Sequence, residues 1–416
     1  MARRRIRSVA VLGGGPAGAY LAAELARAGL RVALFTRGKR PPIIVGESLV
    51  PAVIPFLRHL GVEDEVRGFS VYKPGATFTL DLDEVRSFTF AEVRGAVTSY
   101  SYNVPRDRFD AALLEAALHA GARRVEHGAV VERDGEGDRV RLSEAAIAAS
   151  DGFLEGQPDL IVDAGGRARQ IANLLELPYE TGERRDWALH AHLEGVSLVR
   201  EGDVHTDRLE RGWAWRIPLP GRVSVGLVID GEHVRKFGDT AEEQFDAILR
   251  SDRVIRGWGA QARRLTPVVK YSNYQLASLR GVGPNWALAG DAFGFVDPVF
   301  SSGLLVAFDG ARQLTAAVLD GSPRAFARYE RHVIDHLRAW RRVVSYYYDG
   351  RLFTLFKMAD IVQHTLMGRV LNWHFQRHLP RVFTGEATMH RYSRGLLDFM
   401  VHYGLIDTDP QKLEVH

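Results

Sequence analysis

Residues 7–18 read RSVAVLGGGPAG, and this stretch decides the fold. The apolar run at 7–12 predicts a short buried strand, and AYLAAELARAG at 19–29 predicts a helix of small and aliphatic residues that ends at Gly29. The sequence RVALFT at 31–36 predicts a second strand. This order of elements predicts a βαβ unit that carries Gly-x-Gly-x-x-Gly at its first turn.

The three glycines of this turn have separate tasks. Gly13 permits the tight turn, Gly15 lets a pyrophosphate approach the backbone, and Gly18 lets the helix and strand pack closely. Ala17 belongs to the same turn, where the N–H groups of the helix N-terminus favour bound phosphate. We therefore expect a dinucleotide here. The alternative is a glycine-rich turn in a parallel sheet without a ligand.

The end of the second predicted strand departs from the usual dinucleotide pattern. An acidic residue that holds a ribose hydroxyl normally follows the first glycine by about 20 residues. Thr36 stands there instead, and its hydroxyl cannot make the bidentate contact of a carboxylate. Arg37 follows it and can be interpreted either as a reader of the 2′-phosphate of NADP or as a solvated surface residue.

Composition excludes several classes of protein. Cysteine is absent from the 416 residues, so there is no disulfide framework, thiolate nucleophile, zinc–thiolate site or iron–sulfur cluster. The 54 basic and 51 acidic residues nearly balance, and no basic stripe interleaved with aromatics indicates a nucleic-acid partner. No apolar run approaches the roughly 20 residues of a membrane span, and the basic start lacks a signal-peptide pattern. We expect a cytoplasmic protein.

The rest of the chain divides into segments of different texture. A helix is expected at 107–120, a strand that leads into a second glycine loop at 159–166, and hairpin strands within 125–142. Alternating apolar and polar residues over 186–230 predict a mostly antiparallel sheet. Helical spacing predominates from 324 onward.

Three further segments bear on the function. In WALAGDAFGFVDPVFSSGL at 286–304, Asp291 ends a predicted strand and can hold ribityl or ribose hydroxyls, and a helix that begins near Gly303 can support a flavin ring and a small anion. The second segment is GWAWRIP at 212–218, and the third is YKPGATF at 72–78, which Gly46-Glu47-Ser48 precedes.

Together these motifs resemble the flavin-dependent halogenases that use FADH2, within the flavin monooxygenase superfamily. The resemblance extends from about residue 7 to about residue 320. Its most specific parts are the motifs Trp-x-Trp-x-Ile-Pro and Lys-x-Gly-x-x-Phe. The matching residues are Gly13, Gly15, Gly18, Gly46-Glu47-Ser48, Lys73, Gly75, Phe78, Val104, Arg106, Phe109, Asp110, Trp213, Trp215, Ile217, Pro218, Phe295, Pro298, Ser301 and Gly303.

The resemblance implies a fold and a reaction. The expected fold is α/β, with an FAD-binding, Rossmann-like three-layer core over 1–320 and a helical C-terminal region over 321–416. A mixed, mostly antiparallel substrate sheet is expected from about 70–105 and 184–275. Reduced FAD and oxygen would convert a bound chloride or bromide into hypohalous acid. This acid would pass through a tunnel to Lys73, which delivers the halogen to an aromatic substrate.

The same resemblance assigns roles to residues. The FAD contacts would be Gly13, Gly15, Ala17, Gly18, Thr36, Glu47, Ser48, Arg106, Asp291, Pro298 and Leu304. Backbone N–H groups near Ser302 and Gly303 would bind the halide. Trp213 and Trp215 would keep the substrate away from the flavin, and a separate NAD(P)H-dependent flavin reductase would supply FADH2.

Each assignment has a plainer alternative. Lys73 can be an ordinary surface lysine in a turn, because Pro74-Gly75 is a good turn pair. The two tryptophans can be core residues on one face of a strand. Glu47 and Asp291 can be cap or turn residues. The histidines at 190, 192 and 205 have no carboxylate at ligand spacing, so we interpret them as sheet residues and expect no metal.

Three rival functions and the substrate stay open at this point. The rivals are an NAD(P)H-dependent flavin hydroxylase, a flavin reductase of polyprenoid double bonds, and a flavin-binding protein without catalysis. The loop after Pro298 reads VFSS and lacks the acid of tryptophan-halogenating relatives, which favours a phenol, pyrrole or other activated ring, free or carrier-bound. Aromatic residues can line this site or form helix core: Tyr346, Tyr347, Tyr348, Phe353, Phe356 and Trp373.

Overall fold

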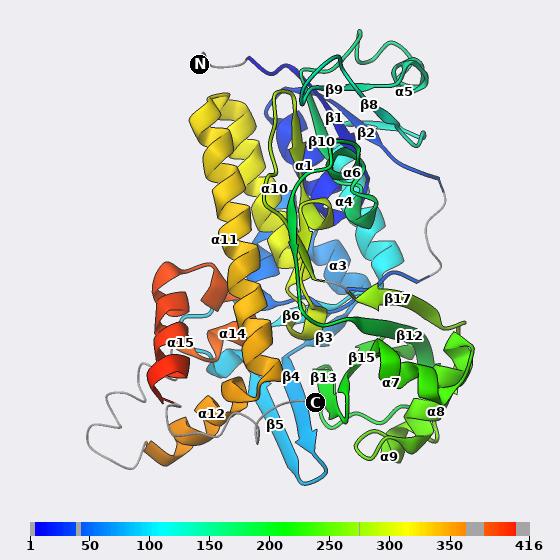
Figure 1. Ribbon diagram of the computed structural model, residues 1–416, viewed down its shortest axis with the longest axis vertical. Helices are drawn as coiled ribbons and strands as arrows, with labels where there is room; N and C mark the ends of the chain where they lie inside the picture. Colours follow the sequence, from blue (N-terminus) through cyan, green and yellow to red (C-terminus); the bar gives the residue numbers. More distant parts are fainter. Residues whose placement is uncertain (1–4, 39–42, 274, 363–377, 405–416) are drawn as a thin grey trace.

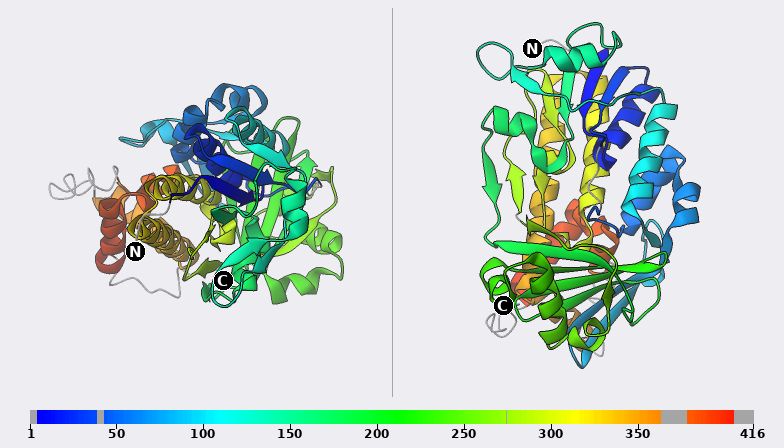
Figure 2. Two further views of the ribbon diagram at one scale, coloured as in Figure 1. Left: turned by 90° about the horizontal axis from the view of Figure 1, so that it is seen from above. Right: turned by 90° about the vertical axis from the view of Figure 1, so that its right-hand side faces the viewer.

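A five-stranded parallel sheet forms the core of one half of the molecule (Figures 1 and 2). The computed structural model describes residues 5–38, 43–273, 275–362 and 378–404. The sheet confirms the predicted βαβ unit, with β1 paired to β2 in parallel and α1 (Pro16–Arg27) between them. Its strands, in spatial order, are β19 (Trp286–Leu288), β10 (Leu160–Asp163), β1 (Ser8–Leu12), β2 (Arg31–Phe35) and β7 (Arg123–Val125).

The glycine turn after β1 is as crowded as the fingerprint predicts. Gly13 has φ +113°, and a Cβ there would lie 2.4 Å from the Ala164 carbonyl oxygen. A Cβ at Gly18 would lie 1.9 Å from the Gly13 carbonyl oxygen. Any side chain at these two positions would therefore force the helix and strands apart.

An eight-stranded sheet forms the other half of the molecule (Figure 2). Its pairings are antiparallel, which confirms the expected sheet, except that β13 and β4 run parallel. The path runs β16 (Arg263–Arg264), β12 (Asp186–Glu194), β15 (Arg222–Asp230), β14 (Gly212–Leu219), β13 (Val204–Leu209), β4 (Gly75–Asp81) and β5 (Glu84–Thr89), with β17 (Val269–Asn273) also on β12.

Three small sheets contain the other strands that the structure describes. The pair β3 (Val71–Lys73) and β6 (Ser101–Asn103) carries Lys73. The predicted hairpin is shorter than expected: only β8 (Val131–Arg133) and β9 (Val140–Leu142) pair, because Val125 belongs to β7 in the parallel sheet. The third sheet contains β11 (Tyr179–Thr181), β18 (Leu276–Ser278) and β20 (Gly294–Phe295).

Helices cover the parallel sheet and connect the two halves. α1 packs against α4 (Arg106–His119) and α10 (Gly303–Asp320), and α11 (Pro323–Tyr348) packs on α10 and runs toward the eight-stranded sheet (Figure 1). The remaining helices are α2 (Ile54–Leu60), α3 (Glu63–Phe69), α5 (Glu144–Ala149), α6 (Gln170–Leu174), α7 (Gly231–Val234), α8 (Ala241–Ser251), α9 (Arg256–Gly259), α12 (Arg351–Val362), α14 (Arg381–Thr384) and α15 (Arg391–Gly404).

The C-terminal helices confirm the expected helical region. Tyr347, Tyr348, Phe353 and Phe356 belong to the hydrophobic core, as the core interpretation predicted, and Tyr346 packs against it. Trp373 lies outside the described residues. Among the helices that the structure describes, none combines the length and apolarity needed to cross a membrane. The division of the chain at residue 320 stays a prediction.

Candidate functional site

A cavity of about 620 Å³ runs from the glycine turn to the tryptophans of β14. Its wall combines the turn after β1, residues 43–48, the start of α4, the loop after β10 and residues 290–307. The cavity brings together most of the residues singled out from the sequence: Gly13, Gly15, Ala17, Thr36, Glu47, Ser48, Arg106, Trp213, Trp215, Asp291, Pro298, Gly303 and Leu304. Gly18, Ser302 and Lys73 lie behind this wall rather than in it.

The glycine end of the cavity can accept a pyrophosphate. Gly15 is the N-cap of α1, which has no side-chain cap and no acidic residue in its first turn. A Cβ at Gly15 would meet nothing within 4 Å, since the space in front of it is the cavity. Uncapped N–H groups at the start of a helix attract an anion, so this end of the cavity fits the phosphates of a dinucleotide.

Thr36 lies in the cavity wall, at the end of β2. Its hydroxyl already accepts a hydrogen bond from Arg124 Nε over 3.2 Å. The neighbouring Arg37 packs its side chain along Gly128 and lines the same part of the cavity. The hydroxyl can still donate one hydrogen bond to a ribose oxygen, which is weaker anchoring than a carboxylate provides.

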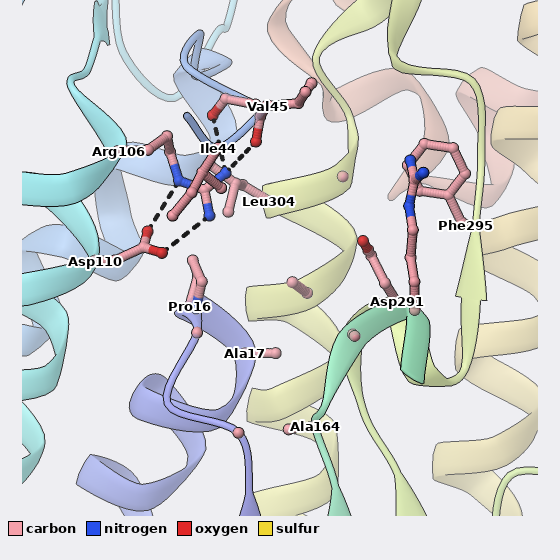
Figure 3. Close-up of a pocket in the computed structure, with 18 of the residues that line it drawn as sticks. Pro16, Ala17, Ile44, Val45, Arg106, Asp110, Ala164, Asp291, Phe295 and Leu304 are labelled. Carbon is pink, nitrogen blue, oxygen red and sulfur yellow. Dashed lines mark hydrogen bonds and ion pairs between the residues drawn. The ribbon is translucent and has the colours of Figure 1, made fainter. Parts of the chain in front are cut away.

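Arg106 and Asp291 lie on opposite sides of the cavity (Figure 3). Arg106 forms a buried ion pair with Asp110, with Nε 2.9 Å from Oδ1, and its Nη1 donates to the Val45 carbonyl over 2.5 Å. Arg106 thereby fixes the loop of residues 43–48, which forms part of the cavity wall. Burial raises the pKa of Asp291, and the positive charges of Arg167 and Arg106 oppose this shift.

Glu47 is held by a histidine that the sequence analysis treated as an ordinary sheet residue. His192 Nε2 lies 2.9 Å from Glu47 Oε1, and Arg222 Nε donates to His192 Nδ1 over 3.2 Å. Because a guanidinium only donates, Nδ1 carries the lone pair and Nε2–H donates to Glu47. Glu47 is therefore a fixed acceptor in the cavity wall and caps no helix. Sequence spacing gives no signal for this pair, which joins residues 145 positions apart.

The N-terminus of α10 faces the cavity at the predicted halide position. Ser301 has φ +55°, and Ser302 is the N-cap of α10 without a side-chain cap. Gly303 lines the cavity, whereas the Ser302 hydroxyl is buried and has no hydrogen-bond partner among the described residues. The first turn contains no acidic residue, so the exposed backbone N–H groups suit a small anion.

Lys73 is buried, so the surface-lysine alternative is wrong. Its side chain is 2% exposed, and Nζ donates to Ser48 Oγ over 2.9 Å and to the Leu49 carbonyl over 2.8 Å. Burial lowers the pKa of Lys73 to about 7, although the Asp203 carboxylate acts in the opposite direction. Near neutral pH the side chain therefore reaches both its ammonium and its amine form, directly behind a residue that lines the cavity.

Trp213 and Trp215 form one aromatic wall of the cavity. Both indoles are buried, and their ring centroids lie 5.7 Å apart. Trp215 Nε1 donates to Ser224 Oγ over 3.2 Å, and Trp213 Nε1 donates to the Tyr348 hydroxyl over 3.0 Å. Gly226 leaves room for this wall, since a Cβ there would lie 2.0 Å from the Trp215 ring. The pair is both core and cavity lining.

Among the cavity residues that sequence reasoning missed are Arg167 and Tyr271. The guanidinium of Arg167 lies 4.4 Å from the centroid of the Phe295 ring and 5.2 Å from that of Tyr271. Arg167 directly follows the second glycine loop that the sequence predicts at the end of 159–166. Tyr271 comes from β17, and only the sheet topology brings it to the cavity.

A cluster outside the cavity joins α10 to α11. Asp309 Oδ2 lies 2.5 Å from His332 Nε2 and 3.4 Å from His336 Nδ1, a set that could hold a metal ion. Trp340 Nε1 donates to His336 Nε2 over 3.2 Å, which puts the ring proton on Nδ1, facing the carboxylate. The hydrogen bonds of the cluster are thus satisfied as it stands, and it forms a polar lock between the helices in which Asp309 and His336 are buried and His332 is partly exposed.

The chain is similar to several known proteins. A family model described as tryptophan halogenase matches residues 8–92 and 84–356. The chain is 27% identical over 387 residues to a 1H-pyrrole-2-carbonyl-(peptidyl-carrier protein) chlorinase of Pseudomonas fluorescens, covering 84% of this chain and 85% of that protein. It is 30% identical over 344 residues to the flavin-dependent halogenase armH3 of Armillaria mellea, covering 74% and 66%.

A solved structure resembles the same region. The myxobacterial chondrochloren halogenase CndH, described as a variant FAD-dependent halogenase, superposes with a TM-score of 0.71 at 28% identity. The superposition covers 83% of this chain and 82% of that one.

Proposed function

Because the chain belongs to the tryptophan halogenase family of flavin-dependent enzymes, we propose that it installs chlorine or bromine on an electron-rich aromatic metabolite. Phenols and pyrroles, free or bound to a carrier protein, are the proposed substrate class. The observation that carries the proposal is the buried amine of Lys73, 2.9 Å from a serine hydroxyl in the cavity wall.

FAD, used as FADH2, O2 and a halide are the cofactors and reactants of this family, and they supply the oxidised halogen. The residues present fit FAD, since an uncapped helix start and a side-chain-free Gly15 face one end of the cavity. Arg106, Glu47 and Asp291 would hold the other polar parts of the cofactor. The N-terminus of α10 at Gly303 would hold the halide.

Lys73 would accept the halogen from hypohalous acid after the acid leaves the cavity and transfer it to the substrate. The amine form can attack hypohalous acid to form an N–X bond and release water, and the ammonium form can donate a hydrogen bond to it. We favour the amine, because the direct partners of Nζ are the neutral Ser48 hydroxyl and Leu49 carbonyl, and burial disfavours the charged form. The aromatic ring then takes the halogen, and the amine is restored as the ring loses its proton.

Trp213 and Trp215 would separate the substrate from the cofactor. Two buried indoles with ring centroids 5.7 Å apart leave no room for an aromatic ring between them. Such a barrier suppresses direct hydroxylation of the substrate.

The substrate class rests on two observations. Residues 299–302 contain no acid, so the ring must be reactive enough without a carboxylate supplied from this loop. The Pseudomonas fluorescens relative is described as a chlorinase of a carrier-bound pyrrole, which supports a carrier-bound pyrrole as one member of the class.

The test supplies the purified chain with FAD, a separate flavin reductase, NADH and either halide. A panel of phenols and pyrroles, each free and as a carrier-protein thioester, is analysed by mass spectrometry. We expect a halogenated product that requires the reductase and the halide. Substrate-stimulated NADH or NADPH consumption without the reductase, together with hydroxylated product, would assign the chain to the hydroxylases instead.

A further inference from the structure

A chain of two hydrogen bonds connects Trp213 to the C-terminal end of α11. Trp213 Nε1 lies 3.0 Å from the Tyr348 hydroxyl, and this hydroxyl lies 2.9 Å from Asp297 Oδ2. All three side chains are buried, and they come from β14, α11 and the loop before α10.

The direction of this chain is fixed by chemistry. An indole N–H can only donate, so the Tyr348 oxygen must accept from Trp213. Its own O–H is then directed to the Asp297 carboxylate, which accepts. Burial and the neighbouring carboxylates of Asp297 and Asp186 raise the pKa of Tyr348 well above its ordinary value, which keeps this proton in place.

One end of this hydrogen-bond chain lies in the cavity wall, and the other end caps a turn that lies in it. Trp213 lines the cavity directly. Asp297 Oδ1 accepts from the Val299 N–H over 3.0 Å and so caps the short turn Pro298–Phe300, whose residues Pro298 and Val299 also line the cavity. One hydroxyl therefore joins the tryptophan wall to the loop that leads to the proposed halide site.

Tyr348 is itself held firmly. The Arg184 guanidinium lies 4.1 Å from the centroid of the Tyr348 ring, and Arg184 Nε lies 2.8 Å from Asp186 Oδ2. At the other end of α11, the Tyr329 hydroxyl donates to the Leu288 carbonyl at the end of β19. The helix thus connects the parallel sheet to the tryptophan wall.

We propose that Tyr348 is the positioning residue of this wall, whose hydroxyl fixes the Trp213 indole and the 297–299 loop relative to each other. The proposal rests on the proposed function only in that the wall serves as a barrier between cofactor and substrate. Loss of the hydroxyl removes the acceptor of the Trp213 N–H and the hydrogen bond that Tyr348 donates to Asp297 Oδ2. The Trp213 indole can then rotate. Oxidised halogen can escape before it reaches Lys73, or the substrate can approach the cofactor.

The chain offers a matched control in the adjacent residue. Tyr347 is also buried, yet its hydroxyl has no hydrogen-bond partner among the described residues. Tyr348→Phe and Tyr347→Phe each remove one hydroxyl oxygen from neighbouring positions of the same helix. Only Tyr348→Phe interrupts the hydrogen bonds that connect Trp213 to Asp297.

The first measurement needs no catalysis. In protein labelled with ¹⁵N-tryptophan, the seven indole N–H signals are recorded, and Trp213 is assigned by its absence in Trp213→Phe. We expect the Trp213 signal to move in Tyr348→Phe and its proton to exchange about tenfold or more faster with D2O. Tyr347→Phe should leave both properties unchanged. A Trp213 signal that is the same in wild type and Tyr348→Phe would overturn the proposal.

If Tyr348→Phe does not fold, indole N–H exchange in the wild-type protein tests the proposal by itself. The Trp258 indole nitrogen is buried and has no partner among the described residues, so it serves as an internal reference. We expect the Trp213 proton to exchange more slowly than that of Trp258, and equal or faster exchange would contradict the proposal.

The second measurement is the fate of reduced flavin under the halogenation conditions above. Tyr348→Phe should raise the ratio of hydrogen peroxide to halogenated product about threefold or more at equal bound FAD, and Tyr347→Phe should not. Equal ratios in the two variants would overturn the positioning role. A wild type that makes no halogenated product would instead reject the proposed function, while the indole measurement still decides whether Tyr348 positions Trp213.

Discussion

Lys73 Nζ donates to the Ser48 hydroxyl over 2.9 Å, and Ser48 lies in the cavity wall while Lys73 lies behind it. The serine is thus the contact between the proposed flavin cavity and the proposed halogen carrier. The Leu49 carbonyl accepts a second hydrogen bond from the same nitrogen, which fixes the direction of the lysine side chain. In the proposed function, this arrangement would separate the site where oxidised halogen is generated from the amine that delivers it.

The first prediction concerns pH. The pKa of Lys73 is lowered to about 7 by burial, so the amine form grows as pH rises through this value. If the amine takes the halogen, halogenated product per flavin oxidised should rise between about pH 6 and 8. A fall over the same range would show that the ammonium form is the active one.

The second prediction uses Asp203, which raises the pKa of Lys73 against the effect of burial. Thr77 Oγ1 donates to one carboxylate oxygen over 2.7 Å, and the Arg200 guanidinium lies 3.8 Å away. Asp203→Asn removes the negative charge, so the midpoint of the pH profile should move to lower pH. The exposed Asp64→Asn should leave the midpoint unchanged. An unshifted midpoint in folded Asp203→Asn would contradict the electrostatic coupling.

The third prediction concerns Gly15. Its backbone conformation is ordinary, with φ −75°, and a Cβ there would meet nothing within 4 Å, so Gly15→Val should fold normally. The valine would occupy the proposed pyrophosphate position, and FAD affinity should fall about a hundredfold or more. Gly68→Val on α3 also adds its side chain to open space and serves as the control. Unchanged FAD affinity in Gly15→Val would mean that the cofactor site is misplaced.

The fourth prediction concerns the lock between α10 and α11. Burial alone would raise the pKa of Asp309, but hydrogen bonds from His332 and His336 outweigh it and lower the pKa far below its usual range. Its contribution to stability is therefore complete above the unfolded pKa of about 3.9 and is lost as pH falls below that value. Asp309→Asn should reduce the free energy of unfolding by about 3 kcal/mol at pH 7.

Urea unfolding measures this effect. The difference between wild type and Asp309→Asn should shrink as pH falls below about 4. Asp64→Asn, which breaks an exposed ion pair with Arg67, should change stability by less than about 1 kcal/mol. Equal destabilisation by the two variants would contradict a stabilising role for the lock between α10 and α11.

Sequence patterns correctly predicted the turns, strands and helix starts that depend on residues close together in the sequence. The glycine turn was predictable because Gly13 and Gly18 face backbone atoms at distances that exclude any side chain. The strands of the parallel sheet and the start of α10 followed from apolar runs and turn residues. The predicted hairpin wrongly included Val125, which pairs with β2 in the parallel sheet. The sequence of a short strand does not indicate whether its partner is a hairpin strand or a strand of a parallel sheet.

Contacts between distant segments were not predictable. Lys73 looked like a turn residue because Pro74-Gly75 follows it, and only the pairing of β3 with β6 and the packing of Ser48 bury it. The pairs His192–Glu47 and Tyr348–Trp213 each join segments more than 130 residues apart, so no spacing rule detects them. Their signal lies in donor and acceptor geometry, which exists only in the folded chain.

The most direct test of the account removes the Lys73 amine. Lys73→Ala and Lys73→Arg are compared with wild type and with the exposed-lysine control Lys236→Ala, using reductase, halide and an accepted phenol or pyrrole. Both Lys73 variants should lose halogenated product by about a thousandfold or more while flavin oxidation continues and hydrogen peroxide accumulates, since guanidinium cannot replace the amine. Retained halogenation in folded Lys73→Ala would contradict the proposed delivery of halogen by Lys73.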